Sequence, residues 1–123
     1  MIAFDGLNLE AGTPIYLQIL QFVKRGAVAG TIRDGDELPS RRVLSALLGV
    51  NPNTVQKAYH LLEEEGLVQS RLGAKSCMVL DETTIARIRQ ELLAESIRSI
   101  AASMRQMGLS KQEALELIEK LWE

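Results

Sequence analysis

Apolar residues recur at every third or fourth position in several stretches of this chain, which is the spacing of helices that bury one face. The first stretch follows an extended lead and begins at Thr13-Pro14, where a threonine cap and a first-turn proline predict a helix start. Gly30 predicts its end, because glycine readily takes the left-handed conformation that closes a helix. The buried face of this helix is expected to contain Tyr16, Ile19, Leu20, Val23 and Ala27.

Two shorter helices joined by a tight turn are predicted next. Ser40 is expected to cap the first and Gly49 to end it. Asn51 is expected to cap the second, with Pro52 at the first helical position, where a missing N–H does no harm. Their apolar residues fall at helical spacing: Val43, Leu44, Leu47 and Leu48 in the first helix, and Val55, Tyr59 and Leu62 in the second.

The second short helix has a polar face formed by Asn53, Gln56, Lys57 and His60. This layout is typical of a helix-turn-helix, whose second helix lies in the DNA major groove. We interpret Asn53, Gln56 and Lys57 as DNA contacts, since they lie on the turns that reach base edges. For Asn51 we favour a role as a helix cap over a DNA contact. His60 is interpreted as a solvent or phosphate neighbour, because no nucleophile is tied to it by position.

Arg41 and Arg42 stand at the start of the first short helix. A solvated pair is the simpler interpretation, but a cation is unfavourable at the positive end of a helix dipole, so two of them favour an anionic partner nearby. Arginine is also the commonest reader of guanine and a strong phosphate ligand. The pattern therefore favours nucleic-acid contact.

Residues 67–70 and 76–80 are predicted to be short strands of a β-hairpin, with Arg71 and Lys75 near its tip. A hairpin beside a helix-turn-helix is a wing, suited to contacting phosphates or the minor groove.

Beyond Asp81 the chain favours two amphipathic helices, separated by Gly108 and with a capping box at Ser110-Lys111-Gln112-Glu113. The last helix is expected to turn Ala114, Leu117, Ile118, Leu121 and Trp122 inward. Such a thin hairpin cannot bury both apolar stripes, so we expect it to pair with a second copy of the chain. The expected dimerisation residues are Ile88, Leu92, Ile97, Ile100, Met104, Leu117, Leu121 and Trp122.

The predicted fold is therefore mainly α with a small β-hairpin: a winged helix-turn-helix domain at residues 1–80, followed by a two-helix dimerisation tail at residues 81–123. A chain of 123 residues has no room for a large catalytic or ligand-binding module as well. No run approaches the roughly 18 apolar residues of a membrane span, and the first residues lack the features of a secretory signal. We expect a cytoplasmic protein without membrane contact.

One cysteine and one histidine cannot form an internal disulfide or a Cys/His zinc site, and we expect neither a metal nor a cofactor. The net charge of −2 argues weakly against a nucleic-acid partner, but the local field matters more than the total. Glu63–Glu65 is expected to be a solvated helix end. The basic residues expected to gather on one side are Arg41, Arg42, Lys57, Arg71 and Lys75.

The motifs of residues 35–67 resemble the DNA-binding domain of the GntR family of bacterial transcription regulators. They read GDELPS followed by Arg42, then GVNPNTV, then KAY at 57–59, then LE and GL at 62–63 and 66–67. The opening PIYxQI at residues 14–19 belongs to the same pattern, so the resemblance covers about residues 13–80. The two-helix tail is similar to that of the YtrA subfamily, whose members lack a large effector domain and dimerise through the tail.

The resemblance implies roles for individual residues. Arg42 matches the family's DNA-contacting arginine, and Gly73 matches the wing-tip glycine. The recognition-helix positions that contact phosphates and bases are held by Asn51, Asn53, Thr54 and Gln56. The wing departs from the family pattern, which usually has a second glycine, a threonine and a phenylalanine at residues 75–77 and often a basic residue at Leu72. Lys75 is expected to supply the phosphate contact instead.

We interpret the chain as a homodimeric transcription repressor that binds a palindromic operator in double-stranded DNA, with two recognition helices about one DNA turn apart. Arg42, Asn53 and Gln56 would choose the sequence, whereas the phosphate contacts would come from Arg41, Lys57, Arg71 and Lys75. A small-molecule effector is compatible with this class, although the sequence shows no pocket for one.

Two rival functions are compatible with parts of the sequence. A winged helix used only for protein contact would show no salt-dependent affinity for DNA, and the polar composition of residues 53–57 counts against it. An enzyme is the second rival, because some GntR relatives carry a pyridoxal-phosphate domain of aminotransferase type. No such domain or cofactor lysine is recognisable in this sequence, and we expect no enzymatic activity.

Overall fold

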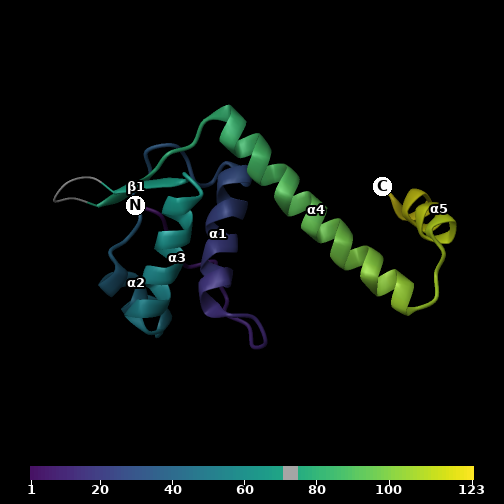
Figure 1. Ribbon diagram of the computed structural model, residues 1–123, viewed down its shortest axis with the longest axis horizontal. Coiled ribbons are helices and arrows are strands. Elements are labelled where there is room, and N and C mark those ends of the chain that lie inside the picture. Colours follow the sequence, from purple (N-terminus) through teal and green to yellow (C-terminus); the bar gives the residue numbers. More distant parts are fainter. Residues whose placement is uncertain (71–74) are drawn as a thin grey trace. The chain divides into compact units, whose positions relative to one another are not determined.

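The computed structural model describes residues 1–70 and 75–123, which contain five helices and one two-stranded sheet (Figure 1). The mainly α fold predicted from the sequence is confirmed. The elements are α1 (Ile15–Ala29), α2 (Arg41–Leu48), α3 (Pro52–Glu64), β1 (Val68–Ser70), β2 (Ser76–Met78), α4 (Glu82–Gln106) and α5 (Lys111–Leu121).

The chain divides into two compact units, Met1–Arg89 and Gln90–Glu123. The sequence placed the division after residue 80, where the predicted hairpin ends. The difference arises because the first turns of α4 belong to the first unit, and Ile88 on those turns is fully buried. Ile88 was predicted to lie on a dimerisation face, but its side chain has no exposed surface in the single chain, and we therefore do not include it in the proposed dimer face.

Helix α1 begins one residue later than predicted. Pro14, and not Thr13, holds the cap position, and no side chain caps the helix. The Pro14 carbonyl instead accepts the first helical hydrogen bonds, from the N–H groups of Leu17 and Gln18 at 3.1 and 3.3 Å. Gly30 ends the helix with a φ of 85°, as predicted. The predicted apolar face is buried except for Tyr16, which is half-buried.

The turn between α2 and α3 forms as the capping residues predict. Ser40 Oγ accepts a hydrogen bond from the Val43 N–H at 3.1 Å, which satisfies one of the free donors at the start of α2. Gly49 takes a left-handed conformation with a φ of 67°. Asn51 Oδ1 then accepts from the Asn53 N–H at 2.8 Å and caps α3. These local hydrogen bonds fix the relative direction of the two helices.

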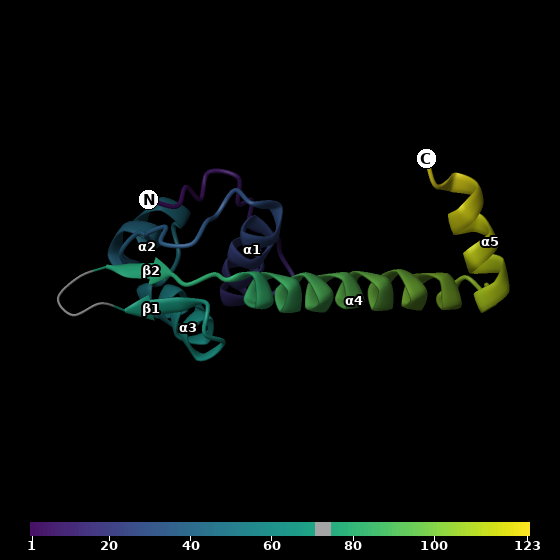
Figure 2. The same cartoon turned by 90° about the horizontal axis from the view of Figure 1, so that it is seen from above.

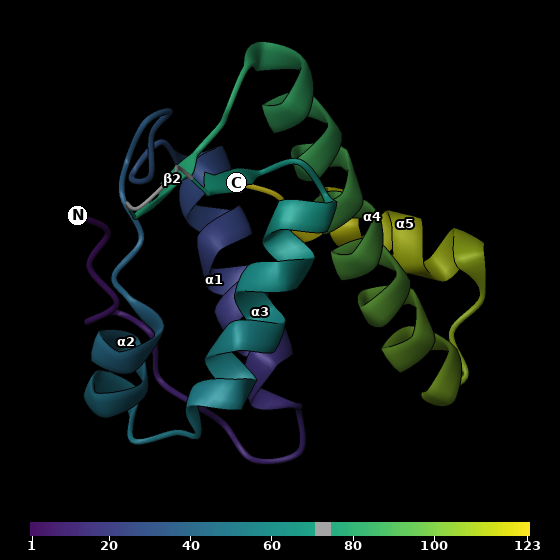
Figure 3. The ribbon, with the colours of Figure 1, turned by 60° about the vertical axis from the view of Figure 1, so that its left-hand side comes forward.

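Helix α3 is the centre of the first unit, where it packs against α1, α2 and β1 (Figure 3). Val55 and Leu62 on its inner face have no exposed surface, and neither has Leu44 of α2. The N-terminal lead, predicted only as an extended segment, adds to this core. Phe4 is 2% exposed and its ring lies 5.2 Å from that of Phe22.

Strands β1 and β2 pair antiparallel, with Val68 opposite Met78 and Ser70 opposite Ser76 (Figure 2). The segment that leads into α2 pairs with the other edge of β2, where the Leu38 N–H donates to the Ser76 carbonyl at 2.9 Å. A bridge joins Glu37 and Cys77 in the same place. The predicted wing is therefore attached to the α2 side of the helix-turn-helix through this additional pairing.

Tyr59 fastens the same segment from the other side. Its hydroxyl, on the buried face of α3, donates to the carbonyl oxygen of Pro39 at 2.7 Å. Burial raises the pKa of the Tyr59 hydroxyl above its ordinary value of 10.0. The neutral hydroxyl therefore holds Pro39, the residue before the Ser40 cap, against α3.

The variant Tyr59→Phe is expected to lower the free energy of unfolding by about 1–3 kcal/mol, because the buried Pro39 carbonyl loses its donor. Since the pKa of Tyr59 is raised in the folded state, its contribution is complete below about pH 10 and is lost as the pH rises above it. Urea unfolding followed by circular dichroism at neutral and alkaline pH measures both effects. In the variant, this part of the alkaline loss should be absent.

Tyr16→Phe is the matched control, because the Tyr16 hydroxyl has no hydrogen-bond partner within residues 1–70 and 75–123. Its neutral-pH stability should change by less than about 0.5 kcal/mol. An equal loss in both variants would mean that the Pro39 contact does not stabilise the fold.

Helix α4 starts with a cap at Asp81, whose Oδ1 accepts from the Thr84 N–H at 2.7 Å, and hydrogen bonds from Thr84 lower the pKa of Asp81. The predicted capping box at the start of α5 is also present between Ser110 and Glu113. None of the helices formed by the described residues is both long and apolar enough to cross a membrane.

Helix α5 does not bury the residues that were predicted to turn inward. None of its residues is buried, and Leu121 and Trp122 are 72% and 80% exposed. On the second unit's part of α4, Ile97 is 64% and Ile100 is 50% exposed. Two helices alone offer too little opposing surface to cover these stripes, so a single chain leaves them in solvent.

Candidate nucleic-acid interface

The outer face of α3 carries the polar residues predicted to contact DNA. Asn53, Gln56, Lys57 and His60 are all exposed, whereas Val55 and the rest of the inner face are buried. The 3.6-residue period of the helix separates these two faces, and burial of the inner one fixes which side chains reach solvent. The structure therefore gathers the sequence-predicted residues of α3 on one surface.

Two hydrogen bonds orient amide side chains on this surface. The Oδ1 atom of Asn51 is engaged in the helix cap, which leaves its amide N–H groups as donors. The Oε1 atom of Gln56 accepts a hydrogen bond from Nη1 of Arg41, the first residue of α2. This contact joins two predicted site residues that are 15 positions apart in the sequence.

Arg42 is exposed and makes no hydrogen bond or ion pair within residues 1–70 and 75–123. Arg42 is the second residue of α2, in the first turn, where the helix dipole makes a cation unfavourable. An arginine held at such a position without a carboxylate partner is suited to an anion or to the acceptor edge of a base.

The two predicted lysines make other contacts. Lys57 Nζ lies 3.9 Å from the centre of the Tyr16 ring, a cation–π contact that holds the side chain toward α1. Lys75 Nζ lies 3.4 Å from a carboxylate oxygen of Glu37. Both ends of this ion pair are exposed, so it is weak and a phosphate can compete with Glu37 for Lys75. Arg71 and Gly73 lie outside the described residues.

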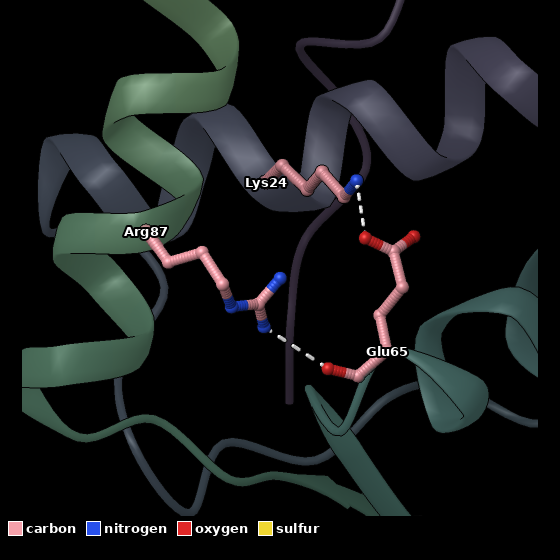
Figure 4. Close-up of polar contacts among 3 residues, drawn as sticks. All are labelled: Lys24, Glu65 and Arg87. Atoms are coloured by element: carbon pink, nitrogen blue, oxygen red, sulfur yellow. Dashed lines mark hydrogen bonds and ion pairs between the residues drawn. The ribbon is translucent and has the colours of Figure 1, made fainter.

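The acidic end of α3 is more than the solvated helix end that was predicted. A carboxylate oxygen of Glu65 lies 2.7 Å from Nζ of Lys24, and Arg87 Nη2 donates to the Glu65 carbonyl at 3.1 Å (Figure 4). The Lys24 side chain is only 9% exposed. The three residues connect α1, the end of α3 and the start of α4. Their contacts therefore help to fix the position of α3 between these two helices.

A signal for this cluster exists in the sequence. Lys24 falls within the apolar spacing of α1, directly after Val23, and a cation in that spacing indicates a buried partner. Which acid would pair with it is set by the packing of α1 against α3. His60 was predicted to be a solvent or phosphate neighbour, and its Nε2 lies 3.0 Å from Glu64 at the solvent surface.

The arrangement presents hydrogen-bond donors from arginine, asparagine and glutamine beside two helix N-termini, while the glutamates lie at the other end of α3. Such donors recognise phosphate oxygens and the acceptor edges of bases. Nowhere in the described ranges are three His, Cys, Asp or Glu side chains grouped as a metal site requires.

Comparison with known proteins also indicates a protein that contacts nucleic acid. The family model described as "Bacterial regulatory proteins, gntR family" matches residues 15–76. The HTH-type transcriptional repressor YtrA of Bacillus subtilis (strain 168) is 31% identical over 116 residues, which cover 94% of this chain and 89% of YtrA.

Solved structures agree with the sequence matches. A GntR family transcriptional regulator from Listeria monocytogenes superposes with a TM-score of 0.78 at 28% identity, over 92% of this chain and 99% of that one. The structure "AraR(DBD) in complex with operator ORX1" has a TM-score of 0.51 at 26% identity, over 63% of this chain and 93% of that one. The first of these two matches extends beyond the winged helix into the helical tail.

Proposed function

This chain belongs to the gntR family of bacterial regulatory proteins and is a transcription regulator with a DNA-binding helix-turn-helix, and from that premise we propose that it is a repressor acting as a homodimer on a palindromic operator. The observation that carries the proposal is the donor-rich outer face of α3, together with Arg42, which has no hydrogen bond or ion pair among the described residues. The repressor role follows YtrA, which is named as a repressor and matches nearly the whole chain.

Residues are assigned to contacts by their chemistry and position. Arg42, Asn53 and Gln56 read base edges in the major groove. Asn51 and Thr54, at the start of α3, contact the DNA backbone. The free N–H groups of the helix N-terminus also favour a phosphate there. The remaining phosphate contacts come from Arg41, Lys57, Arg71 and Lys75, with Gly73 at the tip of the wing. The AraR DNA-binding domain bound to an operator supports this placement of α3, because it shares the fold.

The unit Gln90–Glu123 is the dimerisation region of the proposal. Large apolar side chains there are exposed in the single chain, which is costly in water unless a second copy covers them. A two-fold dimer matches the two half-sites of a palindrome. The proposed dimer face includes Leu92, Ile97, Ile100, Met104, Leu117, Leu121 and Trp122.

A fluorescence-anisotropy titration tests the proposal, with DNA from upstream of the protein's own gene, an unrelated duplex, and two salt concentrations. The upstream DNA should bind more tightly than the unrelated duplex, and salt should weaken both complexes because phosphate contacts release counterions. Arg42→Ala should lose roughly 10-fold or more in affinity for the upstream DNA, because a base or phosphate contact is lost.

Arg25→Ala is the matched control, since it removes the same charge from an exposed position on α1. Its affinity should stay within about 2-fold of the wild type. Selection from a randomised duplex library covers the case in which the operator lies elsewhere. A wild-type protein that selects no sequence would contradict the proposal and favour the rival protein-contact module.

A further inference from the structure

The contact between Arg41 and Gln56 restricts what Gln56 can recognise. The guanidinium of an arginine such as Arg41 carries only N–H donors and no acceptor. A glutamine that meets it must therefore present its carbonyl oxygen, which is the orientation found, with Nη1 donating to Oε1. The amide orientation of Gln56 is thus set by the chemistry of its partner.

This orientation leaves only donors for the DNA. A free glutamine reads adenine with both halves of its amide, because Oε1 accepts from N6 and the NH₂ group donates to N7. With Oε1 engaged by Arg41, the outward group of Gln56 is its NH₂, and the remaining N–H groups of Arg41 lie beside it. Guanine offers two acceptors, O6 and N7, in the major groove, whereas adenine offers one acceptor and one donor.

We propose that Arg41 is a positioning residue that turns the Gln56 amide outward as a donor, so that the pair selects guanine over adenine at one base pair of the operator. This inference rests on the proposed function and adds a specificity rule to it. Arg41 therefore has a second role besides phosphate contact, and it exerts that role through Gln56.

The neighbouring cations do not duplicate this role. Lys57 follows Gln56 in the sequence, but its Nζ lies over the Tyr16 ring and so is directed toward α1. Arg42 follows Arg41 and makes no hydrogen bond or ion pair with the described residues. Among the described residues, the bond from Arg41 to Gln56 is the side-chain hydrogen bond that joins α2 to α3.

The test is selection from a randomised duplex library, followed by titration of duplexes that differ at one base pair. The base pair that Gln56 contacts is the one at which the Gln56→Met variant loses the base preference of the wild type. At this position the wild type should bind guanine roughly 10-fold more tightly than adenine. In Arg41→Met the amide is free to turn over and read adenine, so the preference should fall below about 3-fold.

Two further variants separate orientation from charge. Gln56→Glu keeps an oxygen for Arg41 but removes the NH₂ donors, so the guanine preference should be lost. Lys75→Met removes one cation from the wing and should lower affinity for every duplex without changing the preference at this base pair. Arg41 and Gln56 are exposed, and a circular-dichroism melt of each variant checks that folding is retained.

The outcomes that overturn the inference are distinct from failure of the proposed function. An Arg41→Met protein that keeps the full guanine preference would show that Arg41 does not orient Gln56. A wild type that selects adenine at the Gln56 base pair would contradict the donor-only surface. A wild type that selects no sequence at all would remove the proposed function, and this inference with it.

Discussion

Replacing Ile88 with alanine is expected to lower the free energy of unfolding of the first unit by about 2–5 kcal/mol, the range found when a large buried aliphatic side chain is truncated. Ile88 lies on the second turn of α4 and has no exposed surface. Its loss removes apolar contacts and leaves a cavity at the place where α4 joins the winged helix. Urea unfolding followed by circular dichroism measures the change, and sedimentation velocity reports the oligomeric state in parallel.

Ile97→Ala is the matched control for this prediction. It makes the same change in the same helix, at a side chain that is 64% exposed in the single chain. Its effect on unfolding of the first unit should be within about 0.5 kcal/mol. If Ile88→Ala instead left unfolding unchanged and weakened self-association, Ile88 would belong to the dimer face after all.

The features predicted correctly from the sequence are those that depend on neighbours in the chain. A serine before a helix, a glycine after it and an asparagine followed by proline act over three or four residues, so Ser40, Gly49 and Asn51 could be assigned from their immediate context. The capping box at Ser110 is equally local. Together these signals fixed the helix-turn-helix and the start of α5 to the residue.

Packing partners could not be predicted in the same way. Ile88 and Ile97 are nine residues apart and lie on opposite sides of α4, but periodicity does not say which surface covers each of them. One is fully buried in the first unit and the other is exposed. Phe4 is a similar case, because its burial depends on Phe22, which is distant in the sequence.

The candidate interface also combines features that could be predicted from the sequence with contacts that could not. The exposed face of α3 followed from helical periodicity, and so did the separation of polar from apolar residues. The link from Arg41 to Gln56 and the pair of Lys24 with Glu65 each depend on how two helices cross. Periodicity within one helix carries no information about that crossing. These contacts therefore could not be predicted from the sequence and are seen only in the three-dimensional structure.

Ile97→Glu is expected to convert the proposed dimer to monomer and to lower affinity for a palindromic operator by roughly 10²–10⁴-fold. In a dimer, binding of one copy to the first half-site raises the effective concentration of the other copy at the second half-site, and a monomer lacks this gain. A carboxylate buried between two copies would lose its hydration without a partner. In the single chain the position is 64% exposed, so the fold of each monomer should be retained. Sedimentation velocity and anisotropy titrations measure the two effects.

Arg98→Glu is the control, because it introduces a carboxylate at the adjacent exposed residue, on the side of α4 that faces away from Leu92, Ile97 and Ile100. It should leave both the dimer and the operator affinity within about 2-fold of the wild type. Affinity for a single half-site should be equal in Ile97→Glu and wild-type protein, since the outer face of α3 is unchanged. A loss of half-site binding in Ile97→Glu would mean that α4 supports the recognition helix directly. An intact dimer in that variant would place the proposed contact between copies on another surface.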